Sequence, residues 1–129
     1  MSLDVAWVAG FFDGEGNIWI GKGLLQIQIA ITQKEIGILR LIQQQYGGSV
    51  CKYGIQSCHK WRVCNTADGK RFLWAIKDHV ICKKTEVELA LRFLETKREN
   101  NKGCHPLSAE QIELRSAIRD KMVYLNNIH

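Results

Sequence analysis

Two carboxylates and three glycines lie within one short stretch near the start of the sequence: Gly10, Asp13, Gly14, Glu15 and Gly16. Gly10 and Gly14 are four residues apart, so in a helix they share one face, where another backbone can approach closely. Two such helices can cross tightly about a twofold axis. A carboxylate at the end of each helix, beside free main-chain carbonyls, makes an anionic pocket suited to Mg²⁺ next to a phosphate. A symmetric pair of such pockets could cut both strands of a duplex.

The plainest alternative is an ordinary core helix that ends at a glycine. The sequence Asp-Gly-Glu-Gly offers a hydrophobic core nothing to bury, so we favour the functional interpretation.

Residues 8–16 resemble the motif that names the LAGLIDADG homing endonucleases, because small residues, paired large apolar residues and alternating acids and glycines stand at matching positions. The stretch departs from that motif at Val8, at the aromatic pair Phe11 and Phe12, and at Glu15, where the motif ends in Asp.

The resemblance implies a division of roles among the residues of this stretch. Glu15 is expected to bind the metal, together with the main-chain oxygen of Gly14. Asp13 is expected to be structural, bonding near the helix ends at the dimer axis, where Gly10 and Gly14 let the helices cross.

The resemblance also implies two catalytic residues outside the motif. Gln33, at the end of a predicted strand, corresponds to a polar residue that orients water in the active site. Lys83 corresponds to a lysine near the scissile phosphate, where it could stabilise developing charge or perturb the attacking water. Lys84 remains the competing choice for that lysine.

Apolar periodicity predicts the elements that position these residues. Helices are expected at 4–13, 34–46, 67–79, 83–100 and 108–126, and strands at 17–20, 24–33, 49–53 and 60–65. The isoleucines at 27, 29 and 31 alternate with Gln26, Gln28 and Ala30, which indicates one buried and one exposed face. The order αββαββα with C-terminal helices predicts an α+β fold, a curved antiparallel sheet backed by helices. We expect one domain over residues 1–129, with its core at 4–100.

The exposed face of this sheet is a candidate DNA-binding surface. A curved antiparallel sheet can lie along the major groove, where Gln pairs with adenine edges and Arg or Lys with guanine. The base-contacting candidates by alternation are Asn17, Trp19, Gln26, Gln28, Cys51, Tyr53, Lys60 and Arg62. Lys52 is out of phase with them and is expected to contact phosphate only.

Bulk composition agrees with an intracellular nucleic-acid-binding protein. Residues 1–84 carry 11 Lys/Arg against 6 Asp/Glu, whereas residues 85–129 carry 7 of each, so the net charge of +5 belongs to the first part. The five cysteines are an odd number without a CxxC pair, which argues against a disulfide framework. No apolar run approaches the ~20 residues of a membrane span, and the N-terminal residues lack the basic segment of a secretory signal.

We therefore predict a Mg²⁺-dependent endonuclease (Mn²⁺ could substitute) that cuts both strands of a long, pseudo-palindromic DNA target as a homodimer. The resemblance further implies short 3′ overhangs and a gene lodged in an intron or free-standing. The expected partners are double-stranded DNA and a second copy of the chain, with no membrane and no small-molecule substrate. The site of action would be whichever compartment holds the target, a prokaryotic or phage-infected cytoplasm or an organelle. The alternative is a non-cleaving nucleic-acid-binding protein of the same fold, an intron RNA maturase or a transcription regulator.

Overall fold

The computed structural model describes residues 3–21, 26–54, 57–95 and 109–128. The elements follow the order α1 (Val5–Glu15), β1 (Gly16–Ile20), β2 (Ile27–Gln33), α2 (Ile36–Tyr46), β3 (Ser49–Tyr53), β4 (Cys58–Val63), α3 (Thr66–Ile76), α4 (Lys84–Glu95) and α5 (Ala109–Ile128). This order confirms the predicted α+β arrangement, αββαββα followed by further helices. Within the described residues, no helix combines the length and the apolar composition that crossing a membrane requires.

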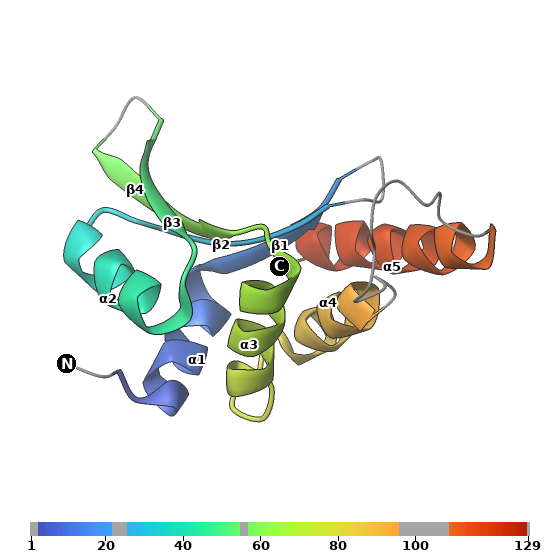
Figure 1. Ribbon diagram of the computed structural model, residues 1–129, viewed down its shortest axis with the longest axis horizontal. Helices are drawn as coiled ribbons and strands as arrows, with labels where there is room; N and C mark the ends of the chain where they lie inside the picture. The colour runs from blue at the N-terminus through green and yellow to red at the C-terminus, as the bar shows by residue number, and fades with distance from the viewer. Residues whose placement is uncertain (1–2, 22–25, 55–56, 96–108, 129) are drawn as a thin grey trace.

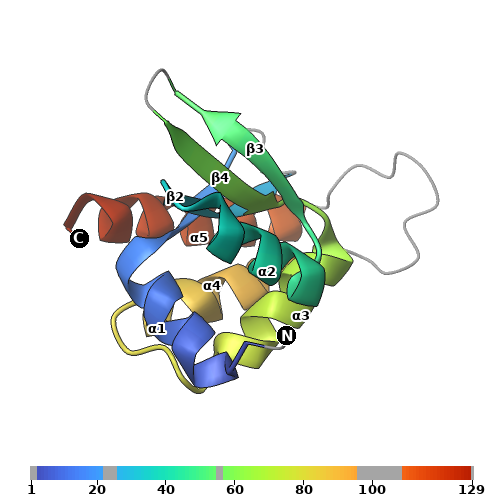
Figure 2. The same ribbon diagram turned by 90° about the vertical axis from the view of Figure 1, so that its left-hand side faces the viewer.

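The four strands form one antiparallel sheet in the order β1-β2-β4-β3. Each half is a pair of strands that follow one another in the chain, and the two halves join where β2 pairs with β4. The sheet is curved, with the helices on one side and the other, concave side uncovered (Figure 1). One end of the β3–β4 pair projects beyond the helices, as Figure 2 shows.

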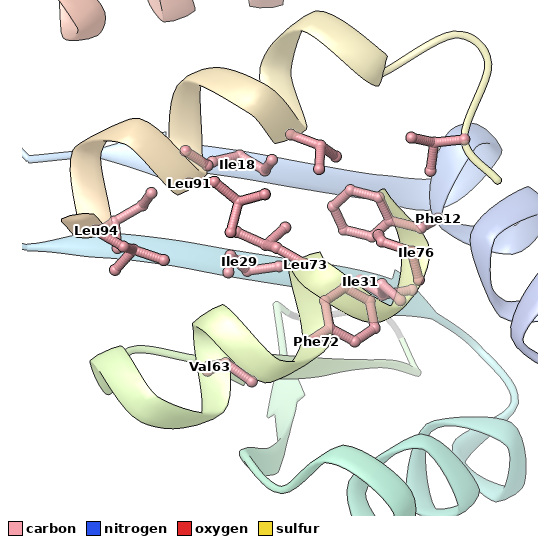
Figure 3. Packing of buried hydrophobic residues seen from close by; sticks show 14 of the residues in the cluster. Phe12, Ile18, Ile29, Ile31, Val63, Phe72, Leu73, Ile76, Leu91 and Leu94 are labelled. Carbon is pink, nitrogen blue, oxygen red and sulfur yellow. The ribbon is translucent and has the colours of Figure 1, made fainter. Parts of the chain in front are cut away.

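The core lies between the sheet and the helices. The predicted inward-facing residues of the two central strands are all buried: Ile27, Ile29, Ile31, Trp61 and Val63. Figure 3 shows Phe12 of α1 and Phe72 of α3 packed against this apolar layer. The ring of Phe72 meets Phe12 edge-on at 5.4 Å and Trp61 at 4.9 Å between centroids, contacts that fix α1 and α3 to the sheet.

Several element ends differ from those expected, each for a local reason. Helix α1 continues to Glu15 instead of stopping at residue 13, because the N–H of Gly16 still donates to the carbonyl of Phe12. Strand β4 ends at Val63, not 65, because Asn65 is the N-cap of α3 and its side chain accepts a 2.8 Å bond from the N–H of Asp68. Residues 22–25 and 96–108, which include parts of a predicted strand and of two predicted helices, lie outside the described residues.

Helix α5 packs on α4 and along the edge strand β1. The side chain of Arg119 donates to the carbonyl of Ile20 at 3.3 Å, and that of Asn126 donates to Ile18 at 3.0 Å. These bonds satisfy carbonyls that an edge strand otherwise leaves open to another chain. Helix α5 therefore closes the β1 edge of the sheet.

Gly48, just before β3, is predicted to be indispensable to the second half of the sheet. It adopts φ +85, and an added Cβ would lie 2.7 Å from the carbonyl oxygen of Arg62. Gly48→Ala should lower the free energy of unfolding by at least about 2 kcal/mol, through left-handed strain and main-chain overlap. Gly37→Ala is the matched control, since Gly37 is in α2 with nothing within 4 Å of the added Cβ, and it should be neutral or stabilising. Urea unfolding of both variants checks this; equal stability would contradict it.

Candidate active site and nucleic-acid interface

Glu15 lies at the junction between α1 and the edge strand β1. The chain passes from helix to strand at Gly16, where a Cβ would overlap the ring of the buried Phe12. That overlap explains the last glycine of the motif. The Glu15 side chain is exposed, and no hydrogen bond or ion pair from another described residue engages it. The carboxylate is therefore available to a ligand.

Asp13 is engaged within its own chain. One carboxylate oxygen accepts from the N–H of Ile81 at 2.7 Å, and the other accepts from the N–H of Lys83 at 3.0 Å. These N–H groups belong to the turn that leads into α4. This contact joins two segments of one chain about 70 residues apart. It agrees with a structural role for Asp13, whose position at a dimer axis stays a prediction.

Lys83 lies beside the end of α1, and Lys84 does not. The ammonium of Lys83 donates to the main-chain oxygen of Asp13 at 2.9 Å, an interaction between a cation and the C-terminal turn of a helix. Lys84 is the exposed first residue of α4. Of the two lysines, Lys83 is thus the one whose ammonium is held at the C-terminal end of α1.

Gln33 ends β2 at the same end of the sheet as Glu15. Gly16 pairs with Ile31, so Gln33 lies two residues beyond that pair, on the side where α1 enters. Its side-chain oxygen accepts from the N–H of Lys34 at 2.8 Å. Its amide NH₂ remains available to donate a hydrogen bond to another partner.

A metal at this site would need ligands from outside a single chain. Among the described residues, no three His, Cys, Asp or Glu side chains converge as a metal site. The available donors are the Glu15 carboxylate and main-chain oxygens, all hard oxygen ligands. Such a set fits Mg²⁺, which commonly takes one or two protein carboxylates and completes its shell with water and substrate phosphate.

The uncovered face of the sheet carries the predicted base-contacting residues in rows across the strands. One row consists of Asn17, Ala30, Arg62 and Ser49, the next of Thr32, Lys60 and Cys51, and a third of Trp19 and Gln28. Gln26, exposed just before β2, and Tyr53, which pairs with Cys58, follow the same alternation. Lys52 falls on the opposite face, as its phase predicted.

Two polar residues of these rows, Thr32 and Ser49, were not among the sequence candidates. The same alternation that selected Gln28 and Cys51 would have found them. Ala30, assigned to the exposed face, does lie there but is only 3% exposed. It lies between Asn17 and Arg62, its partners on the two neighbouring strands.

The side of α1 that faces away from the core contains Gly10 and Gly14, and we call it the bare face of α1. Gly10 and Gly14 are exposed, and an added Cβ at either would have nothing within 4 Å. Trp7 is 47% exposed beside them and stacks on Phe11, with 5.1 Å between ring centroids. Trp7 was missed by sequence analysis, although it is three residues before Gly10 and seven before Gly14, the spacing of one helix face. A bare glycine face with an exposed Trp suits close contact with another helix.

Comparison with known proteins extends this description. No protein-family model matches the chain. Over 53 residues, 38% of this chain, it is 43% identical to the intron-encoded DNA endonuclease ai2b of Dictyostelium discoideum, and it spans 20% of that protein's length.

Solved structures resemble the chain over almost its whole length. The archaeal intron-encoded homing endonuclease I-Vdi141I, complexed with DNA, matches with a TM-score of 0.79 at 16% identity, over 94% of this chain and 82% of its own. The LAGLIDADG homing endonuclease I-SmaMI, bound to cleaved DNA, matches with a TM-score of 0.72 at 18% identity, over 92% of this chain and 43% of its own. The chain thus has the fold of the LAGLIDADG homing endonucleases, and the fold expected from residues 8–16 is confirmed.

The two acids of the motif should differ in their effect on stability. Glu15→Gln should change the free energy of unfolding by less than about 0.5 kcal/mol, because the carboxylate is exposed and unpartnered. Asp13→Asn should cost about 1–3 kcal/mol, because an amide NH₂ cannot accept one of the two N–H bonds. Thermal or urea unfolding without DNA or metal measures both. A larger loss for Glu15→Gln than for Asp13→Asn would contradict the contacts described.

Proposed function

We propose that this chain is a LAGLIDADG homing endonuclease, a site-specific enzyme that hydrolyses both strands of a DNA duplex as a homodimer. One observation carries the proposal. At the end of α1, beside the uncovered sheet, the ammonium of Lys83 donates to the main-chain oxygen of Asp13, and the exposed carboxylate of Glu15 follows two residues later in the chain. A carboxylate for a divalent cation and a lysine for a phosphate thus stand at the margin of a surface suited to DNA.

The concave face of the sheet is the proposed DNA-binding surface. It is free of helices (Figure 1). Its rows contain Lys60 and Arg62 together with residues that have amide and hydroxyl side chains. Arg and Lys can pair with guanine, and Gln28 with adenine, in the major groove. The positive charge of residues 1–84 adds attraction to the phosphates.

The homodimer is proposed from the bare face of α1. One chain offers one Glu15, whereas cutting both strands requires a reaction at two phosphates. Crossing of two α1 helices at Gly10 and Gly14 would bury Trp7 and bring two Glu15 carboxylates close to one axis. The match to less than half of the I-SmaMI chain supports this arrangement, since two copies of this chain correspond in extent to one such longer chain.

Three side chains of each copy have proposed roles in hydrolysis. Glu15, with the main-chain oxygen of Gly14, would hold a divalent cation such as Mg²⁺ or Mn²⁺ against the scissile phosphate. When bound, that cation supplies neutralising charge and acidifies a water molecule. Lys83, held at the C-terminal end of α1, would stabilise negative charge that develops on the phosphate oxygens. The amide of Gln33 orients the attacking water.

The proposed function also implies where the enzyme would act and where its gene would lie. The enzyme would act in the compartment that holds its target DNA, and its gene would lie in an intron or stand free. The similarity to an intron-encoded DNA endonuclease supports this setting. A protein of this fold that binds nucleic acid without cutting would have no use for Glu15, so that residue separates the two functions experimentally.

Glu15→Gln should abolish cleavage while leaving specific DNA binding within about tenfold, because only metal chemistry requires the charge. Selection from a randomised duplex library supplies the target. Nicking and gel-shift affinity are then measured together, with Mg²⁺ and with EDTA. Glu113→Gln, which removes an equally exposed carboxylate on α5, is the matched control and should cut normally. Full cutting by Glu15→Gln, or specific binding without any Mg²⁺-dependent cleavage by the unmodified chain, would contradict the proposal.

The uncovered face of the sheet should discriminate bases, and the opposite face should not. Arg62→Ala and Gln28→Ala should each cost about 1–3 kcal/mol at the preferred site and relax selectivity at one base pair per half-site. Lys52→Ala, on the other face, should leave base selectivity unchanged, and any loss of affinity should be the same for all sequences. Cleavage profiles over single-base target variants at two salt concentrations distinguish these outcomes. Unchanged profiles for Arg62→Ala and Gln28→Ala would show that another surface contacts the bases.

A further inference from the structure

We propose that Asp13 is a positioning residue, which places Lys83 for the reaction by holding the turn formed by residues 81–83. The inference rests on the proposed function and adds to it a residue that acts through another. Three hydrogen bonds join Asp13 to this turn: the carboxylate accepts from the N–H groups of Ile81 and Lys83, and the carbonyl accepts from the Lys83 ammonium.

These bonds bring together two helix ends whose main-chain groups have opposite polarity. The carbonyl of Asp13 is in the last turn of α1, where the helix provides no N–H partner. The N–H of Lys83 lies just before α4, and the carbonyl of Lys83 already accepts from Val87 at 2.9 Å, so Lys83 begins that helix. The carboxylate of Asp13 thus serves as the N-terminal cap of α4, although it belongs to α1.

Packing alone does not hold this turn. Val80 is buried, but the next residue, Ile81, is 84% exposed and Cys82 is exposed as well. A segment without buried side chains depends on its hydrogen bonds for a defined conformation. Because the N–H of Lys83 is itself one of the bonded groups, the carboxylate fixes the backbone from which the lysine side chain extends.

The same bonds separate the tasks of the two acids of the motif. Both oxygens of Asp13 are occupied by main-chain donors, which leaves Glu15 as the carboxylate available to a metal. The ammonium of Lys83 meets a carbonyl instead of a carboxylate, so no anionic side chain neutralises it there. Its charge remains available to a phosphate.

A double-mutant cycle tests whether Asp13 acts through Lys83. Single-turnover cleavage at saturating Mg²⁺ and protein is measured for the unmodified chain, Asp13→Asn, Lys83→Met and the double variant, together with target affinity and sedimentation. Asp13→Asn should slow cleavage by about tenfold to a hundredfold, the effect of misplacing a catalytic group by about 1 Å, with affinity and assembly nearly unchanged. In the Lys83→Met background the same change should have no further effect on the rate.

Asp4→Asn is the matched control, because Asp4 caps the other end of α1 with a 2.8 Å bond to the N–H of Ala6 and does not contact the turn. It should cut at the normal rate. An unchanged rate in Asp13→Asn, or the same fold loss with and without Lys83, would overturn the positioning role. A failure of the unmodified chain to cut DNA would instead overturn the proposed function.

Amide hydrogen exchange in the unmodified protein gives a readout that needs neither activity nor a folded variant. The amides of Ile81 and Lys83 should exchange more slowly than that of Cys82 between them, despite the exposure of Ile81. Equally fast exchange of all three amides would show that Asp13 does not hold the turn, and would overturn the inference on structural grounds alone.

Discussion

Phe12 and Asp13 hold the C-terminal turn of α1 from two sides. The Phe12 ring is buried against Phe72 and the sheet, and the Asp13 carboxylate is bonded to the turn before α4. With both contacts made, the direction in which the helix ends is set. Glu15 is then the last residue of α1, next to the edge strand of the sheet, and the ammonium of Lys83 is held at the Asp13 carbonyl. The rest of the proposed site depends on this anchoring, since neither Glu15 nor the 81–83 turn is fixed by burial of its own.

The face of α1 that contains Gly10 and Gly14 lowers the free energy of unfolding of the isolated chain. Two glycines within a helix cost about 1 kcal/mol each relative to alanine, and a half-exposed Trp7 gains only part of its burial energy. Neither Gly10 nor Gly14 is required by a contact inside the chain, because the space beside each is open. Gly16 differs, since the Phe12 ring excludes any side chain there. A face kept free of side chains for no reason found within the described residues supports the proposed close approach of a second helix.

Periodic patterns predicted most of the fold, and contacts between distant segments account for what they missed. The alternation of Ile27, Ile29 and Ile31 identified the buried face of β2 because that signal is local. It also placed the base-contacting candidates on the face of the sheet that the helices leave uncovered. The partners of Asp13 could not be predicted in this way, because the turn is about 70 residues away and its sequence shows no complementary pattern. The same holds for α5, whose bonds to β1 span about 100 residues.

The central claim is that one helix both assembles the protein and carries its catalytic carboxylate. Sedimentation velocity on the unmodified chain and on Gly10→Val, with and without the selected DNA target, tests it most directly. Because a branched side chain at the helix crossing would hold two α1 helices apart, the account predicts a dimer at micromolar concentration for the unmodified chain. It predicts a folded monomer for Gly10→Val, since a Cβ at residue 10 has no atom of the described residues within 4 Å. An unmodified chain that stays monomeric, alone and on DNA, yet cuts both strands would contradict the account.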